Sequence, residues 1–527
     1  MGTTGVAIAC VTTVVVAVVG TCGVVVVVAV VRLLRRINAS VGIAKPTPAM
    51  ISEEDPSKNC ALFRHLPILS GSLAWRSLGA VAETPIHKCQ LPLMMGSSSS
   101  SSNDDDDGDD DVPVVVVEIL IKREDLISSS YGGNKVRTLQ HQLAVCEVRR
   151  DAGETSFQQL VSLGSGGSNQ VVATVVHARK LGWDNKEGNG AINVCWFDKD
   201  EPDLDNTLNM LSVFSFSNIG FTHDWGTKVG LLKTLSGMYK AWTQKEFVPM
   251  AMGGNCPVGV LGQAGGILEL AEQIQAGTSP DPDRIYIPIG SGCTISGLIL
   301  GVCLARELNL KVFMSPNFKI VGCNVHEGFA LLDRIVGIHT NPLFKFMPLT
   351  ITHSVLGACR ALKQIGGPDL EKKVMAFIKT NVEIRADAQV VGIYGGHSEK
   401  SREAANHYDD KGVVLDYKTG EKKKGLWVCG HFVAKAFYPL MKDMEAEMKR
   451  DKDDNTEKVP PKFMLWMTKS AVQPLGNVDE WSKFTKSNDA VKKWAREGKA
   501  ESTLRPGTVS IDDGKAEDYR SIMTKIL

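Results

Sequence analysis

Residues 131–137 read Tyr-Gly-Gly-Asn-Lys-Val-Arg, and the interpretation of the whole chain starts from this stretch. The apolar run Val114–Ile121 predicts a strand before it, and Val136–Val148 predicts a helix after it. A lysine held in such a strand-to-helix loop can be partly desolvated, which disfavours its ammonium form and makes the amine nucleophilic near neutral pH. Lys135 is therefore a candidate for covalent attachment of an aldehyde cofactor. Taken alone, the motif is as well explained by a solvated lysine at a helix start.

A second glycine-rich motif, residues 290–297 (Gly-Ser-Gly-Cys-Thr-Ile-Ser-Gly), follows a predicted strand, Arg284–Ile289, and opens a predicted helix, Leu298–Arg306. Glycines let the backbone approach a phosphate closely, and a helix start offers free N–H groups. A Walker loop is a poor match because Leu298 stands where lysine is needed, and a dinucleotide fingerprint is weak because Ile295 replaces its third glycine. A tight turn into a packing helix is the alternative. Together with Lys135, the motif favours phosphate binding.

A third motif, residues 164–170 (Gly-Ser-Gly-Gly-Ser-Asn-Gln), lies between a predicted strand, Gln159–Leu163, and a predicted helix, Val171–Leu181. Ser168 and Asn169 are residue types that cap helix N-termini. The same N-terminus can bind a substrate carboxylate, with Ser168 facing the cofactor. Ser168, Asn169 and Gln170 are therefore the predicted substrate-binding residues.

These motifs occur in the order of a known family. Residues 122–126 (Lys-Arg-Glu-Asp-Leu), 132–135, 166–170 and 290–294 resemble the 1-aminocyclopropane-1-carboxylate deaminase/D-cysteine desulfhydrase family. That family is part of the tryptophan synthase β-like, fold type II enzymes, which use pyridoxal 5'-phosphate. The resemblance covers about residues 78–476, and the pairing of the first two motifs is its most specific part.

The resemblance implies a role for each motif residue. Lys135 would hold the cofactor and move protons as a general base, and Ser168 and Tyr394 would face the substrate. A packed loop tyrosine is an equal alternative for Tyr394. Cofactor binding would involve Asn134 on the phenolic oxygen side, Thr468 at the pyridine nitrogen, and the phosphate-binding residues Gly290, Ser291, Gly292, Cys293 and Thr294.

The chain departs from the family at two places. At the first, Phe432 aligns with the family's second tyrosine, with Tyr417 as the alternative occupant of that place, and Val433 replaces the glutamate of the ring-opening deaminases. Lys469-Ser470 replaces two glycines that pack beside the cofactor. The resemblance therefore favours elimination from D-cysteine, giving pyruvate, sulfide and ammonia. The alternatives are a 1-aminocyclopropane-1-carboxylate deaminase or other amino-acid deaminase, and a catalytically decayed, membrane-tethered protein that binds the cofactor.

Short apolar runs alternate with glycine-started helices along the chain. This pattern predicts an α/β fold with parallel sheets flanked by helices, with ligands at the carboxyl ends of the strands. The resemblance implies two domains, a larger one from residues 60–135 and 260–480 and a smaller one from residues 136–259. Residues 481–527 form a polar tail, and the serine and aspartate run at 96–111 is predicted to be a disordered insertion.

Composition excludes some classes of function. With 59 basic and 59 acidic side chains, the chain has no global charge that would favour nucleic acid. Its 12 cysteines and 11 histidines show no zinc-binding spacing, so no metal is expected and the cysteines are predicted to be free thiols. A small amino-acid substrate and a homodimer are what the resemblance implies.

The N-terminal forty residues form a separate segment. Val6–Val31 is apolar, uncharged and longer than the roughly 20 residues that span a bilayer. It predicts a single-pass transmembrane helix, and the basic residues after it would keep the catalytic part cytoplasmic. Import into a mitochondrion or plastid is the alternative, because residues 32–40 are basic with no acidic residue.

Overall fold

The computed structural model of the chain describes residues 42–94, 114–184, 191–196, 202–222, 248–326, 342–392, 395–411, 413–416, 420, 422–424, 427–453, 461–470, 472–477, 481, 489–501, 508–511 and 516–517. The predicted transmembrane segment, the predicted insertion at 96–111 and Tyr394 lie outside these residues. Within the described ranges, no helix combines the length and the apolar character needed to cross a membrane.

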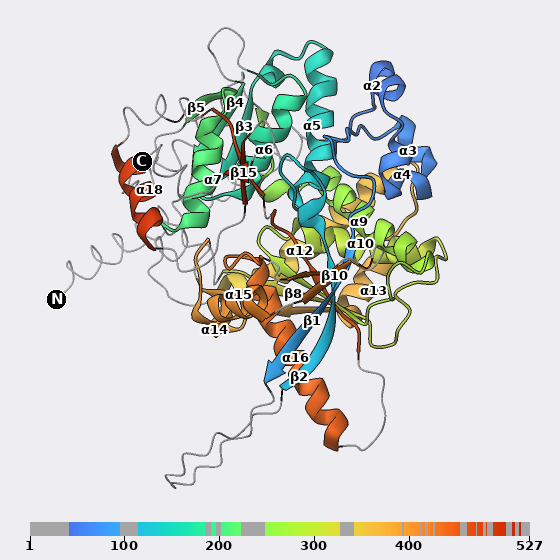
Figure 1. Ribbon diagram of the computed structural model, residues 1–527. Helices are drawn as coiled ribbons and strands as arrows, with labels where there is room; N and C mark the ends of the chain where they lie inside the picture. Colours follow the sequence, from blue (N-terminus) through green and yellow to red (C-terminus); the bar gives the residue numbers. More distant parts are fainter. Residues whose placement is uncertain are drawn as a thin grey trace, which may run out of the picture.

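The larger sheet has eight strands within the described residues and is mixed (Figure 1). In spatial order the strands are β11 (Lys422–Lys424), β10 (Val413–Asp416), β1 (Ile86–Met94), β2 (Val114–Lys122), β12 (Phe463–Trp466), β7 (Arg284–Ile289), β8 (Lys319–Asn324) and β9 (Val382–Arg385). From β2 to β9 all neighbours are parallel, whereas β11, β10, β1 and β2 pair antiparallel. The prediction of purely parallel sheets is therefore wrong for this edge. β1 and β2 are consecutive among the described strands and lie side by side, so the chain reverses direction between them and they pair antiparallel.

The helices cover both faces of this sheet, as alternation along β7 shows. Ile285, Ile287 and Ile289 point into one core and Tyr286 into another. The first core contains side chains of α4 (Ala61–His65), α9 (Pro257–Gln275), α10 (Cys293–Glu307), α12 (Pro342–Gln364) and α13 (Glu371–Asn381). The second contains side chains of α14 (Ala388–Val391), α15 (Glu399–Lys411) and α16 (Val433–Asp453).

The smaller sheet is parallel, as predicted, with the order β5-β4-β3-β6. Its strands are β3 (Leu160–Gly164), β4 (Ile192–Trp196), β5 (Ile219–Thr222) and β6 (Val248–Pro249), and the helices beside it are α5 (Lys135–Asp151), α6 (Asn169–Lys180) and α7 (Leu204–Ser215) (Figure 1). The strands and helices predicted around the three motifs are confirmed to within a few residues. The domain boundaries stay a prediction.

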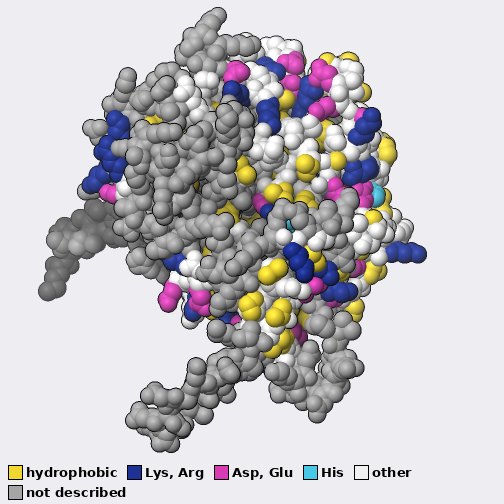
Figure 2. Space-filling view, in the orientation of Figure 1, with side chains coloured by type: hydrophobic (Ala, Val, Ile, Leu, Met, Phe, Trp, Pro, Cys, Tyr) yellow, Lys and Arg dark blue, Asp and Glu magenta, His cyan; other side chains and the backbone are white. Residues whose placement is uncertain are grey.

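The remaining described elements are short or lie near the ends of the chain. Helix α18 (Asp489–Glu501) packs on α7 and buries Trp494, so part of the predicted polar tail is folded (Figure 1). The other elements are α2 (Pro48–Glu53), α3 (Pro56–Asn59), β13 (Val472–Leu475), β14 (Thr508–Ile511) and β15 (Ala516–Glu517), with 3₁₀ helices at Pro67–Gly71, Glu124–Leu126, Thr155–Gln158 and Met252–Gly254. Figure 2 shows acidic and basic side chains interspersed on the described surface of one face, as expected from the balanced charge.

A buried ion-pair network joins β2, α5 and α9. Lys122 Nζ lies 2.6 Å from Glu269 Oε1, and Arg137 reaches Glu269 at 2.8 Å. Arg137 also contacts the Glu124 carboxylate at 2.6 Å. None of these four side chains is more than 6% exposed, and two cations face two anions. The network therefore balances its charge inside the protein, as buried charges must.

This network explains the Lys-Arg-Glu-Asp motif as a structural device. Arg123 pairs with Asp125 at 2.6 Å, and the Glu124 carbonyl accepts a hydrogen bond from the Gly133 N–H at 2.9 Å. The motif thus holds the loop that leads into α5 and fixes where Lys135 begins the helix.

Glu269→Gln tests the network, because it removes one charge and leaves the Lys122 ammonium and the Arg137 guanidinium with one carboxylate. We expect the free energy of unfolding to fall by about 3–5 kcal/mol, the loss typical of breaking a buried pair. Denaturant titration followed by far-ultraviolet circular dichroism measures it.

The matched control is Glu403→Gln. In the unmodified chain the Glu403 side chain is 55% exposed and pairs with Lys400 on the surface of α15. Its unfolding midpoint should stay that of the unmodified chain. Equal midpoints for both variants would show that the buried network contributes nothing to stability.

Candidate active site

The loop before Lys135 requires glycine at two consecutive positions. A Cβ at Gly132 would lie 1.9 Å from the Asp125 carbonyl oxygen. Gly133 has φ 96°, and a Cβ there would lie 2.6 Å from the Thr468 carbonyl oxygen. A side chain at either position would collide with backbone. The two glycines let the loop pass between the Lys-Arg-Glu-Asp segment and the strand end near Thr468, with Lys135 following at the start of α5.

The Lys135 amine faces the interior. Nζ donates a hydrogen bond to the Gly253 carbonyl oxygen at 3.0 Å. The residue as a whole is half-buried, but its amine lies among protein atoms, and this burial lowers the pKa of Lys135. No carboxylate is among the causes of the shift, so no anion offsets the effect of burial on the pKa of Lys135. This is the environment that a nucleophilic lysine needs.

The second motif meets Lys135 at the same carbonyl. Residues 290–292 follow β7 and lead into α10, and Ser291 Oγ donates to the Gly253 carbonyl oxygen at 3.2 Å. Asn134 Nδ2 donates to Thr294 Oγ1 at 2.7 Å, which ties the two motifs together directly. Gly292, the N-cap residue of α10, adopts φ 82°, and the Cys293 N–H makes a long contact of 3.5 Å with Ser291 Oγ. The start of α10 therefore offers backbone N–H donors of the kind that can bind an anion.

Cys293, the first residue of α10, is buried against the Gly253-Gly254 turn. Its Sγ lies 3.3 Å from the Gly254 carbonyl oxygen. Burial raises the pKa of the Cys293 thiol to about 12. The thiol is therefore protonated at neutral pH, and what Cys293 can offer a phosphate is its backbone N–H.

The third motif also reaches this turn. A Cβ on Gly254 would lie 3.5 Å from Gln170 Oε1, a buried oxygen that has no hydrogen-bond partner among the described residues. Asn169 Oδ1 accepts hydrogen bonds from the Tyr131 hydroxyl at 3.1 Å and from Asn209 Nδ2 at 2.9 Å. Ser168 occupies the N-cap position of α6 and is buried, but its side chain makes no capping hydrogen bond. The sequence left two roles open for Ser168, helix capping and substrate binding. In the structure its hydroxyl does not cap α6.

The C-terminal departures lie close to the same site. The Thr468 carbonyl accepts a hydrogen bond from the Asn134 N–H at 3.0 Å, so Thr468 borders the lysine loop. Lys469 directs its amine toward Asp205 Oδ2, 3.7 Å away, and over the ring of Trp427. Phe432 is half-buried and packs on the core beneath α16. Tyr394 is outside the described residues, and the carbonyl of its neighbour Gly395 accepts a hydrogen bond from Asn206 Nδ2 at 2.7 Å.

Sequence reasoning missed a buried cluster beside this site. The carboxylate of Asp203, at the N-cap of α7, contacts Nε2 of both His397 and His431. Although burial opposes it, this carboxylate raises the pKa of His431 to about 10. Burial and the neighbouring His431 lower the pKa of His397 to about 4. No local spacing signals such a cluster, because its members come from α7 and from two segments some 200 residues further on.

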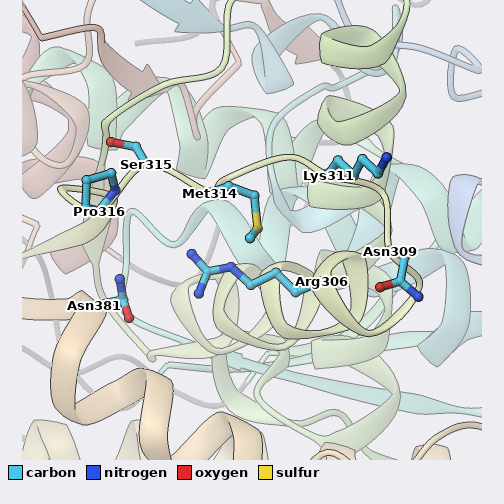
Figure 3. Close-up of a pocket in the computed structure, with 7 residues that line it drawn as sticks. All are labelled: Arg306, Asn309, Lys311, Met314, Ser315, Pro316 and Asn381. Atoms are coloured by element: carbon cyan, nitrogen blue, oxygen red, sulfur yellow. The ribbon is translucent and has the colours of Figure 1, made fainter.

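A surface pocket lies elsewhere in the fold. It has a volume of about 360 Å³ and is lined by Arg306, Asn309, Lys311, Met314, Ser315, Pro316 and Asn381 (Figure 3). These residues gather at the C-terminal end of α10, roughly 20 Å along a 15-residue helix from its glycine-rich start. The pocket is therefore separate from the region around Lys135.

Comparison with known proteins finds relatives of modest identity. A putative 1-aminocyclopropane-1-carboxylate deaminase of Pyrococcus furiosus is 26% identical over 200 residues, which are 38% of this chain and 55% of that protein. A D-cysteine desulfhydrase of Klebsiella pneumoniae is 27% identical over 228 residues, 42% of this chain and 61% of that protein. The family resemblance is confirmed. The chain spans little more than half the length of these curated relatives.

The fold was also compared with solved structures and the sequence with family models. The crystal structure of a 1-aminocyclopropane-1-carboxylate deaminase homologue aligns with a TM-score of 0.47 and 19% identity, covering 78% of this chain and 94% of that one. No family model matches the chain.

The lowered pKa of Lys135 can be measured on the amine itself. A neutral amine is acylated and an ammonium is not, so the reactivity of Lys135 should rise with pH through a midpoint below the ordinary 10.5. Competitive acylation at a series of pH values, with peptide mass spectrometry, follows this residue alone. The same residue in the urea-unfolded chain is the control and should titrate near 10.5. A midpoint in the folded chain at or above that of the unfolded chain would contradict the assigned environment.

Proposed function

We propose that the chain is a pyridoxal phosphate-dependent lyase that eliminates the thiol of D-cysteine, giving pyruvate, sulfide and ammonia. The observation that supports this most is the shared Gly253 carbonyl, which brings the Lys135 amine and the Ser291 hydroxyl to one point. This closeness of the lysine to the glycine-rich helix start supports the proposal, because an aldehyde cofactor with a phosphate tail needs both groups within its own length. The relatives' names support the class of reaction.

The residues present fit this cofactor. The N-terminus of α10, with Gly292 at φ 82° and only a long Cys293 N–H contact to Ser291 Oγ, suits a phosphate group, because N–H donors and the helix dipole act together. The half-buried Lys135 amine, with its lowered pKa, suits attachment of the aldehyde. Asn134 and Thr468 border the space between the two motifs. Together these residues would hold the phosphate at one end and the reactive carbon at the other.

When bound, pyridoxal phosphate supplies a pyridine ring that withdraws electrons from the substrate's α-carbon. The residues of this chain would bind the substrate and move its protons. The Lys135 amine would be the base that accepts the proton from the substrate's α-carbon. Burial lowers the pKa of the Lys135 amine, which favours the neutral form that can accept a proton.

The third motif would hold the substrate. The N-terminus of α6 presents N–H groups to a carboxylate, and the Ser168 hydroxyl is free of a capping role. The buried Gln170 Oε1 is an acceptor with no protein partner among the described residues and suits a donor group of a ligand. We further propose that Tyr394 faces this substrate, that the fold is of type II and that the enzyme is a homodimer. A single-pass anchor at residues 6–31, with the catalytic part cytoplasmic, remains our proposal for its location.

Replacing Lys135 by alanine tests the assignment most directly. Lys135→Ala should lose the yellow colour of covalently held cofactor and all pyruvate formation from D-cysteine. Ser168→Ala should keep the colour and lower kcat/KM by about 10–100-fold, the loss expected for one hydrogen bond to a charged substrate group. Absorbance spectra and a coupled pyruvate assay measure both.

The matched control is Lys442→Ala, which removes an exposed lysine of α16 and should keep wild-type colour and rate. If Lys135→Ala retains the wild-type rate, the proposal is wrong. Borohydride reduction and peptide mapping locate the attachment independently.

The choice of substrate is tested separately on the unmodified chain. Sulfide and pyruvate from D-cysteine, with none from L-cysteine, support the proposed reaction. Ketobutyrate from 1-aminocyclopropane-1-carboxylate would instead indicate the deaminase. Retention of the cofactor without turnover of any amino acid would indicate the decayed, cofactor-binding protein.

A further inference from the structure

Five side chains from three segments form a largely buried polar cluster beside the candidate site. Asp203 and Asp205 belong to the start of α7, and His397, Cys429 and His431 come from the segments before α15 and α16. The donor atoms of Asp205, Cys429 and His431 all lie within 4.8 Å of one another. Carboxylate, thiol and imidazole together are the ligand types of zinc.

His431 is oriented as a metal-binding histidine is. Its Nε2 donates a hydrogen bond to the Asp203 carboxylate, which fixes the ring and leaves Nδ1 to face the other way. Nδ1 is buried and has no hydrogen-bond partner among the described residues. It lies 3.9 Å from Asp205 Oδ2, and Cys429 Sγ lies 3.8 Å from that same oxygen.

The alternative triplet in this cluster is less suited to an ion. In the set Asp203, His397 and His431, the His431 nitrogen and the Asp203 oxygen are already in hydrogen-bond contact. No room for an ion remains between them. In the set Asp205, Cys429 and His431, the atoms are spaced more widely. A tetrahedral zinc needs its ligand atoms roughly 3.3–3.8 Å apart. Side-chain shifts of about 1 Å or less would bring the three ligand atoms to this spacing.

We propose that Asp205 Oδ2, Cys429 Sγ and His431 Nδ1 bind one divalent ion of the zinc class, with Asp203 as the positioning residue of His431. Three protein ligands leave a fourth position open for water or another small ligand. Nothing in this proposal depends on pyridoxal phosphate.

Lys469 is the competitor for this site. Its amine is buried, lies 3.7 Å from Asp205 Oδ2 and makes no hydrogen bond within the described part of the chain. In the ion-free protein it supplies positive charge to Asp205. A divalent ion at this site would bring its own positive charge to Asp205 and replace that interaction. Removing the lysine charge should therefore strengthen metal binding.

The site lies next to the loop proposed to bind substrate. Asp205 is one helical turn before Asn209, whose side chain bonds to the Gly167 carbonyl at 2.7 Å and to Asn169 at 2.9 Å. Tyr131, which bonds to Asn169, also interacts electrostatically with Asp205 and Cys429. An ion bound to Asp205 can therefore stabilise the loop at residues 164–170 through Asn209 and Tyr131.

Cobalt(II) is the probe, because it occupies zinc sites and a thiolate ligand gives it a near-ultraviolet charge-transfer band. Titrating the full chain, stripped of metals by chelation, should give this band with an end point of one ion per chain. Zinc should then displace the cobalt. Cys429→Ser should lose the band, whereas Cys359→Ser, a buried free cysteine in the other core, should keep it.

Two more variants test the roles around the ligands. Asp203→Asn should keep the band and weaken binding by about 10–100-fold, the effect typical of a residue that orients a ligand histidine. Lys469→Met should tighten it. Far-ultraviolet circular dichroism confirms that each variant is folded.

The proposal is overturned if the unmodified chain shows no thiolate band, or if folded Cys429→Ser keeps it. Absence of the band would mean that the cluster is an ion-pair network of His431 and Lys469 with the two aspartates. Neither result bears on Lys135, whose role is tested by the colour and activity of its own variant.

Discussion

The buried network of Lys122, Arg137, Glu124 and Glu269 is the constraint on which the rest of the structure depends. It connects an edge of the parallel part of the larger sheet to α9 and to the first turn of α5. Because two cations and two anions are enclosed together, none can move without leaving a charge uncompensated. The first turn of α5 is therefore held rigidly, and Lys135 lies at its start.

The candidate site is the meeting point of three loops on one short turn. Gly253 and Gly254 accept contacts from Lys135, Ser291 and Cys293, and Gln170 lies beside them. Each loop follows a strand of a parallel arrangement, where carboxyl ends collect ligands. Both glycines of the turn have positive φ, a backbone conformation that favours glycine. A Cβ at Gly253 would collide with Ser291, and a Cβ at Gly254 would collide with Thr138.

Residues 429–431 and Lys469, which is one of the departures from the family pattern, form a group in space. Cys429, His431 and Lys469 all surround Asp205, and Asp203 orients His431. A lysine in place of a glycine therefore does not intrude alone into the candidate cofactor site. Its amine is directed to a carboxylate and an aromatic ring on the other side. Lys469 is best understood together with Asp205, Cys429 and His431, as part of one buried polar cluster.

The sequence by itself predicted the local features: strands and helices around each motif, glycines at the loops, and the lysine with a phosphate-binding helix start. These follow from periodicity and backbone stereochemistry, which act over a few residues. Only the tertiary structure decided the antiparallel edge, the structural role of Lys-Arg-Glu-Asp, and the cluster in which Asp203 meets His431 across 228 positions. Contacts at that separation leave no spacing in the sequence, because they depend on how whole elements pack.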